Sequence, residues 1–325
     1  MNIQGVILAA GKGKRLQPVT PARTKAMAPV AGKPIVARVF DLFVENGVRE
    51  VVLLVSPDDN AIIPYFEQHT PPGIRVTFVV QQERLGMAHA LGLVAPHLHG
   101  DFIMSACDNL VPPEHIAALV ATHQREQAHA TLSLMEIDIA HSASTGIVEW
   151  KNGSERSFIR RIVEKPKPAE APTNISSLPL YVFSSKLLDY LPLVQPSPRG
   201  EYELQDAIQL LIDHGGRVTG VLTDVRWQLT NVQDLLELNR HYLTAELGQQ
   251  PPAHPINHGV CLIPPVQIDA DCVIEPSCII GPHVYLEAGC RVGTGARVEN
   301  AILLRNAVVE AGQKVTDRVI LGEAS

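Results

Sequence analysis

Short apolar runs alternate with amphipathic stretches along the first 125 residues. Apolar runs of this length, bounded by glycine or polar residues, predict buried strands, and stretches with a 3.6-residue period predict helices. We expect strands over 5–11, 50–56, 74–82 and 101–108, and helices over 34–46, 86–98 and 112–127. Strands that alternate with helices build a mostly parallel sheet covered on both faces.

The pattern is less regular from residue 130 to residue 247. Residues 131–137 and 147–151 are expected to form a pair of strands, and residues 178–184 a further strand. The proline-rich stretch 164–174 reads as a loop, and two amphipathic helices are expected over 203–216 and 231–247. The stretch 248–259 has no periodicity and many prolines, which is typical of a linker.

A six-residue hydrophobic period begins after this stretch and continues nearly to the end of the chain. Stacked coils of a parallel β-helix keep such a period, because each flat face repeats every six residues. Three cysteines fall in the second row as small hydrophobic residues. The first row is Leu262, Ile268, Ile274, Ile280, Leu286, Val292, Val298 and Leu304; the second is Val260, Val266, Cys272, Cys278, Val284, Cys290, Ala296, Ile302 and Val308.

Composition narrows the class of protein. The 325 residues are 46% hydrophobic and carry a formal net charge of -7, which indicates a globular chain and disfavours nucleic-acid binding. No apolar run approaches the length of a membrane span, and no leader pattern is seen, so a cytoplasmic protein is expected. The five cysteines include no C-x-x-C pair, which argues against a zinc or redox site.

The turn after the first strand carries the candidate chemistry. Gly11 and Gly13 are followed by Arg15 and, ten positions later, by Lys25. The stretch lacks the Gly-Lys-[Ser/Thr] of a Walker loop, and Leu16 replaces the third glycine of a dinucleotide fingerprint. The remaining reading is a loop around a nucleoside triphosphate, whose backbone N–H groups and two cations bind phosphate oxygens.

Other polar candidates also lie where predicted strands end. Gln81 ends the third strand and Asp108 ends the fourth. Ligands bind at the carboxyl ends of strands in such sheets, so both are expected to share a site with the glycine turn. Taken alone, Asp108 could instead cap a turn, and Gln82 could take the place of Gln81.

The stretch LAAGKGKRLQPVTPARTKAMAPVAGKPI, residues 8–35, resembles the signature of the sugar-1-phosphate nucleotidylyltransferases. QQERLGMAHA, CDN, VEKP, RGEYELQDAIQLLIDHG and NVQDLLELNR resemble further segments of that family, so the likeness covers about residues 3–247. It implies a Rossmann-like, mostly parallel catalytic domain over 1–247, a linker over 248–259 and a short left-handed β-helix over 260–325. Long-form glucose-1-phosphate thymidylyltransferases look most similar.

The resemblance also implies an activity. An oxygen of a sugar-1-phosphate, with glucose-1-phosphate favoured, would attack the α-phosphorus of dTTP or UTP and give a nucleoside diphosphate sugar and pyrophosphate. The resemblance further implies a Mg²⁺ cofactor on Asp108, a homo-oligomer, and the two substrates as the partners. The catalytic residues would be Arg15, Lys25, Asp108 and Lys165. The nucleotide would contact Leu8, Ala10, Gly11, Gly13, Gln81 and Gly86, and the sugar phosphate Gly146, Glu164 and Lys165.

One departure from the family pattern bears on the metal. Leu229 stands where the family's W-x-D-x-G motif has its second metal-binding aspartate. Asn231 or Asp224 could substitute, or the chain could carry a one-residue deletion there. A nucleotide-binding regulatory homologue with poor turnover is therefore an alternative function. A hexapeptide acyltransferase is a weaker one, because the repeat holds only His283.

Overall fold

The structure is a computed structural model that describes residues 3–11, 13, 16–17, 19, 23–152, 155–250 and 259–322. The chain divides into two compact units. The first comprises Met1–Gly11 and Val36–Arg226, and the second comprises Lys12–Ile35 and Trp227–Ser325. Most of the predicted linker lies outside the described residues.

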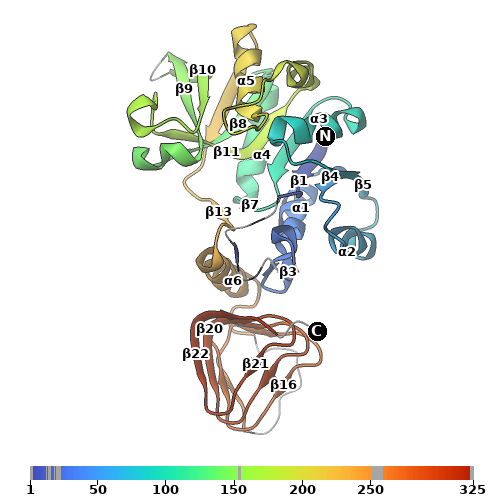
Figure 1. Cartoon of the computed structure of the whole chain (residues 1–325), viewed down its shortest axis with the longest axis vertical. Helices are drawn as coiled ribbons and strands as arrows, with labels where there is room; N and C mark the ends of the chain where they lie inside the picture. Colours follow the sequence, from blue (N-terminus) through green and yellow to red (C-terminus); the bar gives the residue numbers. More distant parts are fainter. Residues whose placement is uncertain are drawn as a thin grey trace. The chain divides into compact units, whose positions relative to one another are not determined.

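A mixed sheet forms the centre of the first unit, in the order β10-β9-β11-β6-β1-β4-β5 (Figure 1). Its parallel part pairs β1 with β4 and β6, and β4 with β5. The later strands pair antiparallel, and β12 joins β8 in parallel beyond β11. The strands are β1 (Gln4–Leu8), β4 (Glu50–Val55), β5 (Arg75–Val80), β6 (Phe102–Ala106), β8 (Ala130–Glu136), β9 (Gly146–Asn152), β10 (Glu155–Glu164), β11 (Ile175–Phe183) and β12 (Val218–Leu222).

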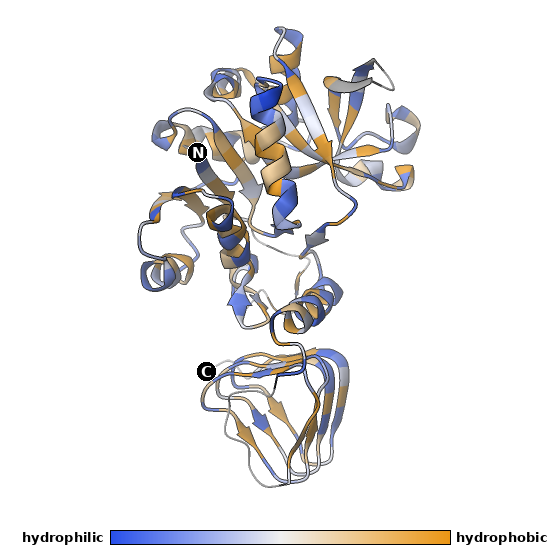
Figure 2. Cartoon of the chain, turned by 180° about the vertical axis from the view of Figure 1, so that it is seen from behind, coloured by the Kyte–Doolittle hydropathy of each residue, from blue (hydrophilic) through white to orange (hydrophobic). Residues whose placement is uncertain are grey.

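Helices flank this sheet and bury their apolar sides against it. Hydrophobic colouring follows the central strands, whereas the helices carry both hydrophobic and hydrophilic residues (Figure 2). The expected helices are confirmed, and Gly47 has the positive φ of 88° that favours glycine just past a helix end. The α-helices of this unit are α1 (Ile35–Glu45, whose first residue belongs to the second unit), α2 (Ile62–His69), α3 (Met87–Val94), α4 (Pro113–Arg125) and α5 (Leu204–Asp213).

Two expectations about this unit differ from the structure. The predicted partners 131–137 and 147–151 do not pair, because β8 pairs with β11 and β12, whereas β9 pairs with β10 and β11. Helix α2 and strands β10 and β12 were not predicted, and β10 is the antiparallel partner of β9. Among the described residues, no helix has the length and apolar character needed to cross a membrane.

The second unit contains α6 (Val232–Glu246), the short strands β2 (Pro29–Val30) and β3 (Lys33–Pro34), and a stack of parallel strands from β14 (Cys261–Leu262) to β22 (Lys314–Ile320). Further strands of the stack are β15 (Val266–Ile268), β16 (Val273–Ile274), β17 (Ile279–Ile280), β18 (Val284–Leu286), β19 (Arg291–Val292), β20 (Arg297–Leu303) and β21 (Val308–Val309). Within the described residues the strands of the stack pair in parallel, consistent with the predicted left-handed β-helix. Figure 1 shows the stacked coils.

The predicted rows of inward residues hold for the first coils and then shift by one residue. Val266 pairs with Val284, 18 positions on, but Val284 pairs with Ala301, 17 positions on. The shift follows Asn300, whose φ is 43°. Val309 therefore lies in the core, and Val308, predicted to lie inside, is 48% exposed.

Candidate functional site

The carboxyl ends of four parallel strands form one edge of the sheet. The Ala9 N–H donates to Leu54 O at 2.8 Å, and the Cys107 N–H donates to Leu8 O at 3.2 Å. The Gln81 N–H donates to Val55 O at 2.9 Å. Leu8, Ala10, Gly11, Gln81 and Asp108 thus belong to neighbouring strand ends, as the sequence analysis expected.

Arg84 ties this edge together and was missed by sequence reasoning. Its Nε donates to Ala10 O at 2.6 Å, at the start of the glycine turn. Its Nη2 donates to the Ser56 hydroxyl and lies 3.0 Å from Asp58 Oδ2, beyond the end of β4. A lone arginine in a loop carries no sequence signal for such a role, so only the fold reveals it.

The predicted base-reading segment has a defined geometry. Gln81 is buried, and its Nε2 lies 3.3 Å from His89 Nδ1, whereas Gln82 is exposed. Gly86 has a φ of 105°, and a Cβ there would lie 2.5 Å from Tyr202 O. The Tyr202 N–H donates to Leu85 O at 2.7 Å, so only glycine allows the two backbones to approach this closely.

Asp108 lies in the turn after β6 beside a buried polar group and a cation. The Arg226 Nε donates to Asn109 Oδ1 at 2.7 Å. Burial lowers the pKa of the Arg226 guanidinium, and the neighbouring Asp108 carboxylate opposes this effect. The Asn109 Nδ2 is buried without a partner within the described part of the chain. Neither Asn109 nor Arg226 was among the predicted site residues.

The predicted sugar-binding residues lie on the antiparallel strands at the same edge. Strand β11 runs antiparallel to β6, so its beginning lies at the carboxyl end of β6. There Ser177 pairs with Gly146, which in turn pairs with Glu164 at the end of β10. The structure therefore brings Gly146, Glu164 and Asp108 to one edge.

Glu164 is the centre of this part of the site. Its Oε1 lies 3.1 Å from Lys165 Nζ and 3.7 Å from Arg199 Nη2. Its Oε2 is buried and makes no hydrogen bond within the described residues. Burial raises the pKa of the Glu164 carboxyl, whereas Lys165 lowers it. Lys165 itself has a φ of 49°, a strained conformation for a residue with a side chain.

A second unpartnered oxygen belongs to a residue that also packs beside Gly146. Gln205, at the start of α5, is buried, and its Oε1 has no partner in the described part of the chain. A Cβ on Gly146 would lie 3.2 Å from both Gln205 Cγ and Glu164 Oε2. Two buried acceptors without donors suit a ligand that brings O–H groups.

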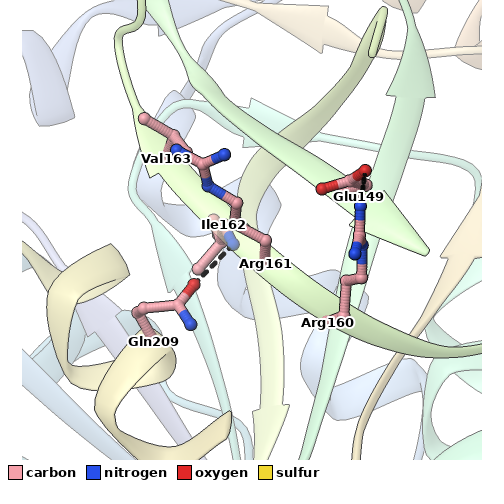
Figure 3. Close-up of a pocket in the computed structure, with 6 residues that line it drawn as sticks. All are labelled: Glu149, Arg160, Arg161, Ile162, Val163 and Gln209. Atoms are coloured by element: carbon pink, nitrogen blue, oxygen red, sulfur yellow. Dashed lines mark hydrogen bonds and ion pairs between the residues drawn. The ribbon is translucent and has the colours of Figure 1, made fainter. Parts of the chain in front are cut away.

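Two hollows lie along β10, and one of them reaches Glu164. One, of about 660 Å³, is lined by Glu164, Arg199, Glu203 and Asp206, among others. The other, of about 420 Å³, lies along β10 (Figure 3), where Gln209 of α5 accepts a hydrogen bond from the Ile162 N–H at 2.8 Å and Arg160 contacts Glu149. Gln209 thereby covers the open edge of β10 and fixes the strand that ends at Glu164.

The remaining predicted site residues belong to the second unit or are not described. Gly13 has a φ of 58°, and its carbonyl accepts the Leu16 N–H at 2.9 Å. Lys25 begins a single 3₁₀ turn, Lys25–Met27. Arg15 lies outside the described residues.

The donor atoms fit a magnesium ion held by one carboxylate. Asp108 offers hard oxygen ligands, and Mg²⁺ commonly takes one or two carboxylates and fills its remaining positions with water and phosphate oxygens. Among the described residues, no group of three or more His, Cys, Asp or Glu side chains is placed so that it could hold a metal ion. Leu229 is fully buried, and the Asn231 Oδ1 caps α6 by accepting the Gln233 and Asp234 N–H groups at 2.8 and 3.1 Å.

Comparisons with known proteins agree with this architecture. The Nucleotidyl transferase family model matches residues 4–245, and the GMPPB C-terminal domain model matches residues 262–325. The UTP--glucose-1-phosphate uridylyltransferase AglF of Haloferax volcanii is 34% identical over 227 residues, which cover 70% of this chain and 90% of the relative.

Two further proteins share part of this likeness. The bifunctional protein GlmU of Methanococcus maripaludis is 30% identical over 85% of this chain, but the match spans only 62% of that relative's length. A solved UDP-glucose pyrophosphorylase in complex with UDP-glucose is 18% identical and has the same fold, with a TM-score of 0.69 over 76% of this chain and 100% of that one. From the family model and the AglF match together, this chain is a member of the nucleotidyl transferase family.

Proposed function

We propose that the protein joins a nucleoside triphosphate to a sugar-1-phosphate, with UTP or dTTP as the nucleotide and glucose-1-phosphate as the favoured sugar. One observation carries the proposal. A single edge of the sheet holds the start of the glycine turn, Asp108, and the pair Glu164 and Lys165. The names of the AglF relative and of the solved pyrophosphorylase support the same class of substrates.

The proposed reaction is an in-line displacement. An oxygen of the sugar phosphate attacks the α-phosphorus, the bond from that phosphorus to the bridging oxygen of the β-phosphate breaks, and pyrophosphate leaves. Negative charge gathers at this centre, so catalysis rests on positioning and charge neutralisation. A Mg²⁺ ion held by Asp108 would neutralise phosphate charge when bound.

Each remaining residue has a proposed part. The backbone at Gly11 and Gly13, with Arg15 and Lys25, binds the leaving phosphates, and Leu8 and Ala10 line the nucleotide. The Gln81 amide pairs with the imide edge of uracil or thymine, and Gly86 keeps the adjoining backbone close. Lys165 binds the sugar phosphate, while Glu164 accepts hydroxyl groups of the sugar beside Gly146.

Arg226 is an added candidate for this chemistry. It is a cation beside Asp108, and its charge also influences the buried Tyr181, which in turn interacts with Glu164. Arg226 is therefore coupled electrostatically to the proposed metal ligand and, through Tyr181, to a proposed sugar-binding residue. Burial lowers the pKa of Arg226 more than the Asp108 carboxylate raises it. The position therefore suits an added anion, such as a phosphate oxygen at the reacting centre.

The C-terminal coils are proposed to assemble subunits, with the catalytic part ending near residue 247. Light scattering of the full chain tests the homo-oligomer, and limited proteolysis tests the boundary at 248–259. His283 offers little support for acyl transfer, because this residue of the coils lines a hollow together with Glu237, Arg240 and His241 of helix α6 in the same unit.

The test of the function is pyrophosphate release with Mg²⁺ from five nucleotides, dTTP, UTP, ATP, GTP and CTP. Each is paired with glucose-1-phosphate and with N-acetylglucosamine-1-phosphate. Turnover with a uracil or thymine nucleotide supports the proposal. Nucleotide binding without turnover for any pair, extended to a wider set of sugar phosphates, favours the regulatory alternative that Leu229 raises.

A further inference from the structure

The segment from Arg23 to Ile35, which carries Lys25, is anchored on the C-terminal part of its own unit. Both ends of this segment make specific contacts with α6 or with the parallel coils. Lys25 lies between the two anchors, in the turn Lys25–Met27. The geometry of that turn thus depends on residues more than 200 positions away in the chain.

The first anchor is a two-pronged ion pair. The Arg23 Nη1 and Nη2 donate to Glu287 Oε1 and Oε2 at 2.9 and 2.8 Å. The two side chains are only 18% and 10% exposed. Glu287 Oε2 also accepts the Arg305 N–H at 2.7 Å, so a hydrogen bond from the next coil orients the carboxylate that binds Arg23. Such a bidentate pair defines direction as well as distance.

The second anchor holds the hairpin of β2 and β3. Asn239 of α6 accepts the Ala31 N–H at 2.8 Å and donates to Pro29 O at 3.3 Å. At the tip, Gly32 has a φ of 73° and lies so close to Gln267 of β15 that a Cβ would overlap the amide. The hairpin therefore cannot shift without losing buried hydrogen bonds.

We propose that Glu287 is a positioning residue for the nucleotide site, acting through Arg23 on the segment that presents Lys25 to the triphosphate. The coils then have a part in nucleotide binding besides any part in assembly. This inference rests on the proposed function, because it assigns Glu287 an effect on a phosphate contact of that reaction.

The physical reason is the precision that phosphate binding needs. Lys25 acts as a point charge on a flexible stem, so its backbone must be placed by something else. A shift of about 1 Å in a catalytic group can cost on the order of a hundredfold in rate. The fork to Glu287 supplies a fixed point two residues before Lys25.

The chain offers a matched control for this test. Glu275 also accepts a backbone N–H from the next coil, that of Thr294 at 2.8 Å, as Glu287 does from Arg305. Unlike that of Glu287, the Glu275 carboxylate makes its hydrogen bonds within the described coils to Thr294 alone and not to the segment from Arg23 to Ile35. Glu275→Gln thus disturbs the coils alone, and Glu287→Gln disturbs the coils and the anchor.

In the full chain, we expect Glu287→Gln to lower kcat/KM for the nucleotide about tenfold and to leave the KM for the sugar phosphate near the wild-type value. Glu275→Gln should match wild type. Arg23→Gln should reproduce the defect, and the double variant should be no worse than either single one, because both remove the same contact. Hydrogen exchange should be faster at the backbone amides of 23–35 in Glu287→Gln only.

Equal kinetics and equal exchange in Glu287→Gln and Glu275→Gln would overturn the inference. So would additive losses in the double variant. If Glu287→Gln does not fold, Arg23→Gln, which leaves the coils intact, decides the matter by the same two measurements. If the wild-type chain turns over no pair of substrates, the proposed function itself is overturned. If the wild type is active and Glu287→Gln is unaffected, only this inference is overturned and the proposed function stands.

Discussion

Gly146 faces Glu164 across the paired strands β9 and β10, and a Cβ on Gly146 would lie 3.2 Å from Glu164 Oε2. That oxygen is buried and has no partner among the described residues. A methyl group added at Gly146 would therefore crowd the oxygen that we propose accepts a sugar hydroxyl.

Replacement of Gly146 by alanine should therefore weaken sugar binding. We expect the KM for the sugar phosphate to rise about tenfold, as for the loss of one hydrogen bond to a charged group, with little change in the KM for the nucleotide. Steady-state kinetics with each substrate varied in turn measures both. Gly92→Ala in α3, where an added Cβ meets nothing within 4 Å, is the control and should leave both constants unchanged.

Loss of the Arg226 charge should reduce turnover. Arg226→Gln removes the cation beside Asp108 and should lower kcat about 10- to 100-fold, as expected for a charged hydrogen bond. Arg226→Lys should recover part of the loss. The exposed Arg125, paired with Glu126 at 2.9 Å, provides the control Arg125→Gln. An Arg226→Gln variant with wild-type kcat would remove Arg226 from the reaction.

Gly86 should tolerate no side chain. Gly86→Ala places a Cβ 2.5 Å from Tyr202 O at a φ of 105°, so we expect the free energy of unfolding to fall by about 2 kcal/mol. Chemical denaturation measures this change. Gly100 also has a positive φ, 82°, but an added Cβ there has open space, so Gly100→Ala separates backbone strain from the steric clash.

Acid should destabilise the first unit through two buried histidines of α4. His115 Nε2 lies 2.8 Å from Ser133 Oγ, and His123 Nδ1 lies 3.0 Å from Thr131 Oγ1. Burial lowers the pKa of both imidazoles; Glu114 opposes this at His115, Asp101 opposes it at His123, and His129 adds to it at His123.

The unfolded chain, with an ordinary histidine pKa of about 6.5, therefore binds more protons than the folded chain below that pH. The free energy of unfolding should be highest above pH 6.5 and fall as the pH drops, by up to about 1.4 kcal/mol per histidine per pH unit. Calorimetry at pH 7.5 and 5.5 measures the fall. His123→Gln should reduce it and the exposed His141→Gln should not; an equal fall in both would assign the acid sensitivity elsewhere.

The coils allow a direct test of their changed repeat. Val309 is buried in the core and its neighbour Val308 is 48% exposed. Val309→Asp buries an unpaired charge and should cost about 3 kcal/mol or more, whereas Val308→Asp should change stability by less than about 0.5 kcal/mol. If Val308→Asp were the more destabilising of the two variants, the result would support the uninterrupted six-residue period, which places Val308 in the core.

Local patterns predicted most of the fold. The apolar runs of β1, β4, β5 and β6 and the period of the coils are strong signals because burial imposes them residue by residue. The pairing of β9 was wrong, because its partner β10 begins with the polar residues Glu155 and Arg156 and gives no apolar run. The shift at Asn300 was missed because the coil there is one residue shorter, yet the later positions of the six-residue rows, Ile302, Leu304 and Val308, are still aliphatic.

The site residues that belong to recognisable sequence motifs could be predicted. Glu164, Lys165 and Asp108 come from recognisable segments, and the fold places them on one edge. Arg84, Gln205 and Arg226 were missed, because each is a lone polar residue whose role depends on contacts with distant strands. The contact of Arg23 with Glu287 spans 264 positions, and no local pattern encodes it.

The most direct measurement is ³¹P NMR of the full chain with Mg²⁺, UTP or dTTP and glucose-1-phosphate, compared with Asp108→Asn. We expect the wild type to convert both substrates into a nucleoside diphosphate sugar and free pyrophosphate. The Asp108→Asn variant should still bind the nucleotide but catalyse the conversion at least about a hundredfold more slowly. Equal rates in the two proteins, or no conversion of any nucleotide and sugar phosphate by the wild type, would contradict the proposed site.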